Sequence, residues 1–177
     1  VIHGAILAFI LSLRRKGNLT ANRWLALFLV ACMVSVLSVY IQYAKFHLLF
    51  PHFFIISTVA VFLLGPALFF YVWILTAIHR KSRWTDVLHF IPFLLYSTLL
   101  LILIISTNTD TLADFLKEMD ADILEGVRFG LLPSLKLLHL IVYTILMLNI
   151  LRKHSSRIKS NFSNLDQINL RWLQYFV

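Results

Sequence analysis

Long apolar runs separated by short polar segments dominate the pattern of this chain. Four such runs carry almost no charge, and they cover residues 24–44, 53–78, 88–106 and 129–151. A helix of about 20 residues crosses roughly 30 Å of hydrocarbon, and a continuous helix satisfies its own backbone hydrogen bonds there. The pattern therefore predicts four complete transmembrane helices.

Apolar segments also stand at both ends of the sequence. Residues 1–13 are too short to span a bilayer, so we expect them to be the end of a longer first helix, and residues 170–177 to begin a sixth. A signal peptide would carry its basic residues before the apolar stretch, whereas Arg14, Arg15 and Lys16 follow it. The expected fold is all-α, a polytopic transmembrane helical bundle with five spans, the first one truncated, plus the start of a sixth.

Basic residues gather in alternate loops of this predicted bundle. They fill the loops at 14–23, 79–86 and 152–171, whereas the loops on the other side carry only Lys45 and Lys117. Loops rich in lysine and arginine stay in the cytoplasm. The acidic residues collect in one loop on the opposite side, at Asp110, Asp114, Glu118, Asp120, Asp122 and Glu125. We therefore expect a multi-pass protein of the bacterial cytoplasmic (inner) membrane with its N-terminus outside.

Composition changes this interpretation little. The chain is 60% hydrophobic with a formal net charge of +8. In a soluble protein that charge would suggest nucleic acid, but most of the sixteen lysines and arginines lie in the predicted inner loops, where anionic lipid head groups explain them. The lone Cys32 excludes a disulfide framework within these residues. The predicted partner is therefore the lipid bilayer.

One helical face in the last complete span carries groups that could bind a ligand. Arg128, Lys136, His139 and Tyr143 fall within about 80° of one another when each residue turns the helix by about 100°. Lys136 lies about 12 Å deeper along the helix axis than Arg128. A cation at that depth is costly unless it faces the bundle interior, water or a counter-ion. This face is a candidate site for a small polar or anionic ligand that enters from the outer side.

A structural interpretation of the same face stays open. Arg128 would then extend to the outer head groups, while Lys136 and His139 would bond only to neighbouring helices. Gly65 and Pro66 stand midway in their span, where the proline removes a backbone hydrogen bond and should kink the helix. Such a kink serves packing or gating.

Catalytic patterns are absent from the sequence. It contains no HExxH motif, no nucleophile elbow and no aspartate or glutamate within a predicted span, and its histidines are scattered. We therefore predict no enzyme activity, no cofactor and no metal site. In the acidic loop, Leu112, Phe115, Leu116, Met119 and Ile123 follow a helical period, which predicts an amphipathic surface helix that acts as a connector or a lid.

Several segments together resemble a known family. They read GNLTANRWLALFL at 17–29, GPALFFYV at 65–72, LHFIPFLLY at 88–96 and FSNLDQINLRWLQYF at 162–176. This order resembles the N-terminal membrane region of bacterial AraC-type transcriptional regulators. The resemblance covers nearly all of the chain, and it implies about seven transmembrane helices followed by a cytoplasmic helix-turn-helix domain that binds DNA.

The sequence thus predicts one transmembrane sensor domain over residues 1–177, which controls a C-terminal effector outside this chain. A homodimer is expected, because helix-turn-helix effectors commonly bind paired half-sites. Two alternatives stay open. The same membrane region could belong to a histidine kinase, or the chain could be a transporter or channel subunit, which would need a continuous polar path lined by several helices.

Overall fold

The chain folds as a bundle of helices. A computed structural model describes residues 2–13, 17–76, 83–108, 110–112, 114 and 131–161. Within these ranges the elements are helices joined by short turns, with no strand. The predicted all-α class is confirmed.

Four helical segments are long and apolar enough to cross a membrane. They are α2 (Leu19–Tyr43), the segment Pro51–Thr76, the segment Trp84–Ser106 and the Pro133–Arg157 part of α8 (Leu131–Asn161). Pro51–Thr76 comprises α3 (Pro51–Ser57), the 3₁₀ turn η2 (Thr58–Ala60) and α4 (Val61–Thr76). Trp84–Ser106 comprises η3 (Trp84–Phe90) and α5 (Ile91–Ser106). The structure also describes two shorter elements, α1 (Ile2–Leu13) and η1 (Phe46–Leu48).

Local signals explain where these helices begin. The side chain of Asn18 accepts a hydrogen bond from the Ala21 amide at 3.1 Å and caps α2, after Gly17 has turned the chain with a φ of +86°. The predicted start at residue 24 was late because hydropathy marks only the apolar part of a helix. At η3, the Arg83 amide donates to the Asp86 carboxylate at 2.9 Å, so polar residues again open a span.

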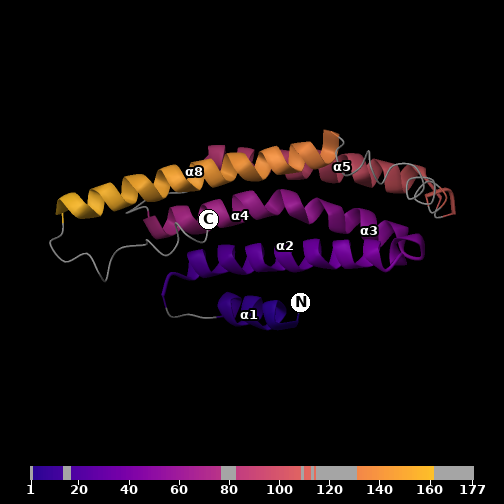
Figure 1. Cartoon of the computed structure of the whole chain (residues 1–177), viewed down its shortest axis with the longest axis horizontal. Helices are drawn as coiled ribbons and strands as arrows, with labels where there is room; N and C mark the ends of the chain where they lie inside the picture. Colours follow the sequence, from indigo (N-terminus) through magenta and orange to yellow (C-terminus); the bar gives the residue numbers. More distant parts are fainter. Residues whose placement is uncertain are drawn as a thin grey trace.

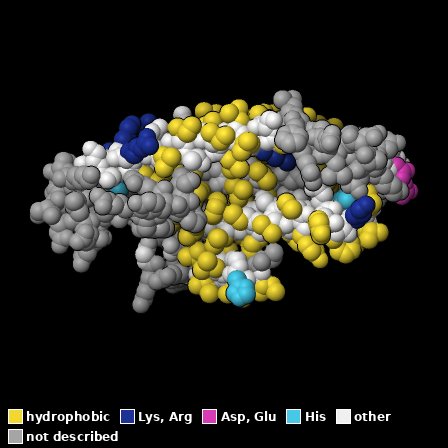
Figure 2. Space-filling model, in the orientation of Figure 1, with side chains coloured by type: hydrophobic (Ala, Val, Ile, Leu, Met, Phe, Trp, Pro, Cys, Tyr) yellow, Lys and Arg dark blue, Asp and Glu magenta, His cyan; other side chains and the backbone are white. Residues whose placement is uncertain are grey.

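The α3–α4 span is the centre of the bundle. Figure 1 shows α4 between α2 and α8, with α1 on the far side of α2. Every residue of α4 from Gly65 to Phe70 is buried, whereas no residue of α5 is. The side chains of α5 that stay exposed are mostly large and apolar, as expected of a helix that faces lipid. Figure 2 shows that apolar side chains also cover much of the middle of the molecule in the orientation of Figure 1.

The central span changes its helix type before its proline. The 3₁₀ turn η2 lies at Thr58–Ala60, and α4 then continues through Gly65 and Pro66 to Thr76. Pro66 has no amide hydrogen for the carbonyl of Phe62, one turn earlier. In Figure 1 the span bends where α3 joins α4.

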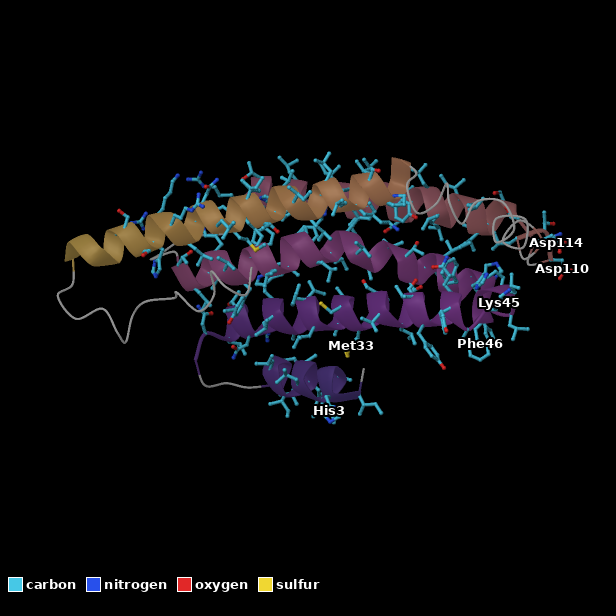
Figure 3. All side chains as sticks on the ribbon, in the orientation of Figure 1. His3, Met33, Lys45, Phe46, Asp110 and Asp114 are labelled. Carbon is cyan, nitrogen blue, oxygen red and sulfur yellow. The ribbon has the colours of Figure 1, made fainter. Side chains whose placement is uncertain are left out.

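Helix α8 is longer than a bilayer requires. Its 31 residues extend about 46 Å, whereas the hydrocarbon layer is roughly 30 Å thick. The predicted end at residue 151 was wrong because the helix continues through Arg152 and Lys153 to Asn161. Asp110, Asp114 and Lys45 lie together at the opposite end of the bundle (Figure 3). The predicted amphipathic helix beyond Asp114 and the predicted sixth helix fall outside the described residues.

Candidate polar site between α4, α5 and α8

The candidate face of α8 points into the bundle. Lys136 contacts Tyr96 of α5, His139 contacts Phe62 of α4, and Tyr143 is buried against α4 and η3. The structure therefore brings three of the four predicted residues to one interface. The fourth, Arg128, lies outside the residues that the structure describes.

Lys136 has an aromatic ring as its described partner. Its Nζ lies 5.3 Å from the centre of the Tyr96 ring, which is within the range of a cation–π interaction. The described carboxylates, Asp86, Asp110 and Asp114, belong to the ends of helices rather than to this interface. The lysine charge thus faces an aromatic ring at membrane depth, and an anion brought to it would find no carboxylate competing among these residues.

The Tyr96 ring is held in place from η2 and α4. Thr58 gives its hydroxyl proton to the Ile55 carbonyl at 2.7 Å, so in its 3.4 Å contact with Tyr96 the tyrosine hydroxyl must be the donor. Phe62 packs on the same tyrosine with 5.2 Å between ring centres. The ring beneath Lys136 is therefore oriented by the η2 turn.

His139 is the least satisfied polar group of the interface. Its ring lies between Phe62, at 5.4 Å between centres, and Tyr143, at 4.8 Å. Both ring nitrogens are buried, and neither has a hydrogen-bond partner among the residues that the structure describes. Leaving a buried polar atom unpaired costs about 1–3 kcal/mol. Such a group is either a defect of packing or part of a binding site, and its position one helical turn from Lys136 favours the site.

Tyr143 joins α8 to the start of the α5 span. Its hydroxyl lies 2.8 Å from Nδ1 of His89 and donates to the His89 carbonyl at 3.2 Å. A hydroxyl has one proton, so this geometry assigns the Nδ1 proton of His89 to the bond with the tyrosine oxygen. The pair is thereby hydrogen-bonded in both directions.

Gly65 permits this arrangement. A Cβ atom placed there would lie 2.5 Å from Cδ2 and 2.7 Å from Cγ of Tyr143. Phe69 then meets the other side of the tyrosine edge-on, at 5.7 Å between ring centres. Gly65 is therefore needed for the close approach of α4 and α8.

Comparison with protein-family models, with curated proteins and with solved structures gave no match. The resemblance to the membrane region of AraC-type regulators stays a prediction. Within the described part of the chain, no three histidine, cysteine, aspartate or glutamate side chains come together as metal ligands would.

Four contributors were missed by the sequence reasoning. Thr58 and Phe62 lie one helical turn apart, and His89 and Tyr96 are seven residues apart, so each pair could have been placed on one helix face. Helix periodicity does not say which neighbouring helix a face meets. The histidines looked scattered for this reason, although His89 and His139 both contact Tyr143.

Tyr143→Phe tests the link between α8 and η3. We expect it to lower the free energy of unfolding by about 1 kcal/mol, because it removes a neutral hydrogen-bond partner from His89. Tyr43→Phe is the matched control, since Tyr43 is 88% exposed. Reversible unfolding in lipid bicelles measures both. Equal effects of the two substitutions would show that the hydroxyl of Tyr143 contributes nothing specific.

Proposed function

We propose that this chain is a membrane-embedded signal-input domain, which binds a small polar or anionic ligand between α4, α5 and α8. The observation that carries the proposal is the position of two polar side chains at one interface. Among the described residues, Lys136 faces an aromatic ring, and the ring nitrogens of His139 have no hydrogen-bond partner. Polar and charged groups are energetically costly inside a membrane, so those that are retained there commonly belong to a functional site. A ligand with hydrogen-bonding oxygens and negative charge would satisfy both.

Helix α8 is the candidate transmitter. It carries Lys136 and His139 near its start and extends about three turns beyond the thickness of the hydrocarbon layer. A ligand shifts an equilibrium only if it binds the two conformations differently. Closure of Tyr96 and His139 around an anion would change how α8 lies against α4, and the projecting end would carry that change to an effector.

The identity of the effector rests on the resemblance of the sequence to the membrane region of AraC-type regulators. In this proposal it is a C-terminal cytoplasmic DNA-binding domain of the AraC type, working as a homodimer, with a histidine kinase as the alternative. A transporter is less well supported, because aromatic rings pack in series in the interior, with Phe62 on His139, His139 on Tyr143 and Tyr143 on Phe69. Aromatic packing of that kind would interrupt a polar path.

Ligand binding can be tested on the reconstituted chain with defined probes. Short monocarboxylates and phosphate monoesters are titrated while the melting temperature is followed, since a ligand that binds only the folded state raises it. We expect at least one probe class to stabilise the wild type and to have no effect on Lys136→Met. Arg23→Met is the matched control, because Arg23 is exposed at the start of α2 and should leave the response intact. Failure of both classes to stabilise the wild type would contradict the proposal.

The proposed orientation places the N-terminus outside and the long end of α8 in the cytoplasm. In a Cys32→Ser background, we expect Asp114→Cys to react with an impermeant maleimide in intact cells and Arg157→Cys to react only after lysis. Asp114 and Arg157 lie at opposite ends of the bundle. The reverse labelling pattern would invert the topology, and with it the assignment of α8 as the cytoplasmic transmitter.

A further inference from the structure

A cavity lies away from the polar site, at the far end of α4 and α8. Its volume is about 420 Å³, and among the described residues its lining comes from these two helices. Small-molecule sites usually measure about 300–1,000 Å³, so the space can hold part of an organic ligand. Neither Lys136 nor His139 lines it, and Phe69, which also packs on Tyr143, is the lining residue that lies between the two sites.

The lining of this cavity changes character along the helix axis. Trp73, Leu146 and Ile150 make the part nearer the bundle centre apolar. One to two turns further along α8, Lys153, His154 and Arg157 border the opposite end. About 16 Å separates the two ends along α8, from Leu146 to Arg157. Figure 2 shows Lys and Arg side chains next to the apolar surface at this end of the molecule.

We propose that this cavity binds one anionic phospholipid of the leaflet at this end of α4 and α8. The phosphate would lie among Lys153, His154 and Arg157, and the first part of an acyl chain would lie along Trp73 and Ile150. A soluble anion would match only the cationic end, and a neutral lipid only the apolar end. The order of the two surfaces along α8 is the order in which a phospholipid presents its head group and its chain.

The two cations on one helix face give the phosphate a defined position. Lys153 and Arg157 are four residues apart, so both project toward the same side of α8, and His154 also contacts the Thr76 backbone of α4. A bound phosphate would therefore lie on α8, beside the end of α4 at Thr76. The site does not depend on the proposed signalling ligand, although both act on α8.

Native mass spectrometry of the purified full chain tests this inference. Dioleoyl phosphatidylglycerol and dioleoyl phosphatidylcholine are added in turn, and the affinity for the first bound lipid is measured. We expect phosphatidylglycerol to bind more tightly, and Lys153→Gln and Arg157→Gln each to weaken it about fivefold. Arg152→Gln is the matched control, because Arg152 is exposed at the same depth but does not line the cavity. It should change the affinity less than about twofold.

One further variant and one competition experiment distinguish a lipid site from other kinds of anion binding. Ile150→Trp fills the apolar part without changing charge, and it should also weaken phosphatidylglycerol binding. Glycerol 3-phosphate should fail to displace the lipid, because it lacks the acyl chain. Equal losses of phosphatidylglycerol affinity in Arg152→Gln and Lys153→Gln would show that surface charge alone causes the binding. Efficient displacement of the lipid by glycerol 3-phosphate would show that the site binds soluble phosphate. Either outcome overturns the lipid assignment and leaves the Lys136 site untouched.

Discussion

Gly65→Leu is expected to lower the free energy of unfolding by about 3 kcal/mol, because the new side chain would overlap the Tyr143 ring where α4 meets α8. Gly65→Ala shows whether the helix propensity of alanine or its clash with Tyr143 has the larger effect on stability. Alanine would favour the helix by about 1 kcal/mol if nothing were in the way. Its Cβ, however, would lie 2.5 Å from Cδ2 and 3.1 Å from Cβ of Tyr143, close to the base of a rigid side chain. We therefore expect even alanine to destabilise the fold.

A double-mutant cycle separates this clash from a general effect of glycine replacement. In a Tyr143→Ala background the obstruction is gone, so Gly65→Ala should become neutral or stabilising, with a coupling of about 1–3 kcal/mol. Gly4→Ala is the matched control, because its Cβ would meet only the flexible end of Met33, at 2.9 Å from the sulfur. Unfolding in bicelles gives all the values. Additive effects of the two substitutions would show that Gly65 and Tyr143 do not constrain each other.

The apolar runs were sufficient to predict the helices but not their partners. Each span needs an uninterrupted stretch of apolar residues, so composition alone locates α2 and α8. Helix ends were less well predicted, because polar residues such as Asn18 at one end of α2 and Arg157 near the end of α8 belong to the helix pattern without being apolar. The pattern also could not show that α4 is buried and α5 exposed, since both spans are equally apolar.

The candidate site was predicted only in part, because helix periodicity identifies a face but not the groups that the face contacts. Periodicity placed Lys136, His139 and Tyr143 on one face of a single helix, and the structure shows that this face is turned inward. The groups opposite come from other helices, and their positions depend on packing. Gly65 had been interpreted with Pro66 as a kink, whereas its contact with Tyr143 gives it a packing role that only the three-dimensional arrangement reveals.

Lys136→Met is expected to raise the free energy of unfolding by about 1 kcal/mol. A lysine costs about 2.5–3.5 kcal/mol at the centre of a transmembrane helix and less toward its ends, and Lys136 lies near the start of the span Pro133–Arg157. A cation–π contact with Tyr96 returns about 0.5–1 kcal/mol of this cost. Methionine keeps the length of the side chain and fills the same space. A residue that lowers stability is retained when function requires it, so this gain should accompany the loss of anion binding.

The measurement distinguishes a binding group from a structural one. Leu135→Met is the matched control, because Leu135 is the preceding residue, is 49% exposed and does not contact Tyr96; it should change stability by less than about 0.5 kcal/mol. Tyr96→Leu should destabilise the wild type more than it destabilises the Lys136→Met variant, because in that variant no cation lies over the Tyr96 ring. If Lys136→Met instead unfolds more readily than the wild type, Lys136 is a structural element of the α5–α8 contact. The site would then lose the feature that marks it as a receptor for anions.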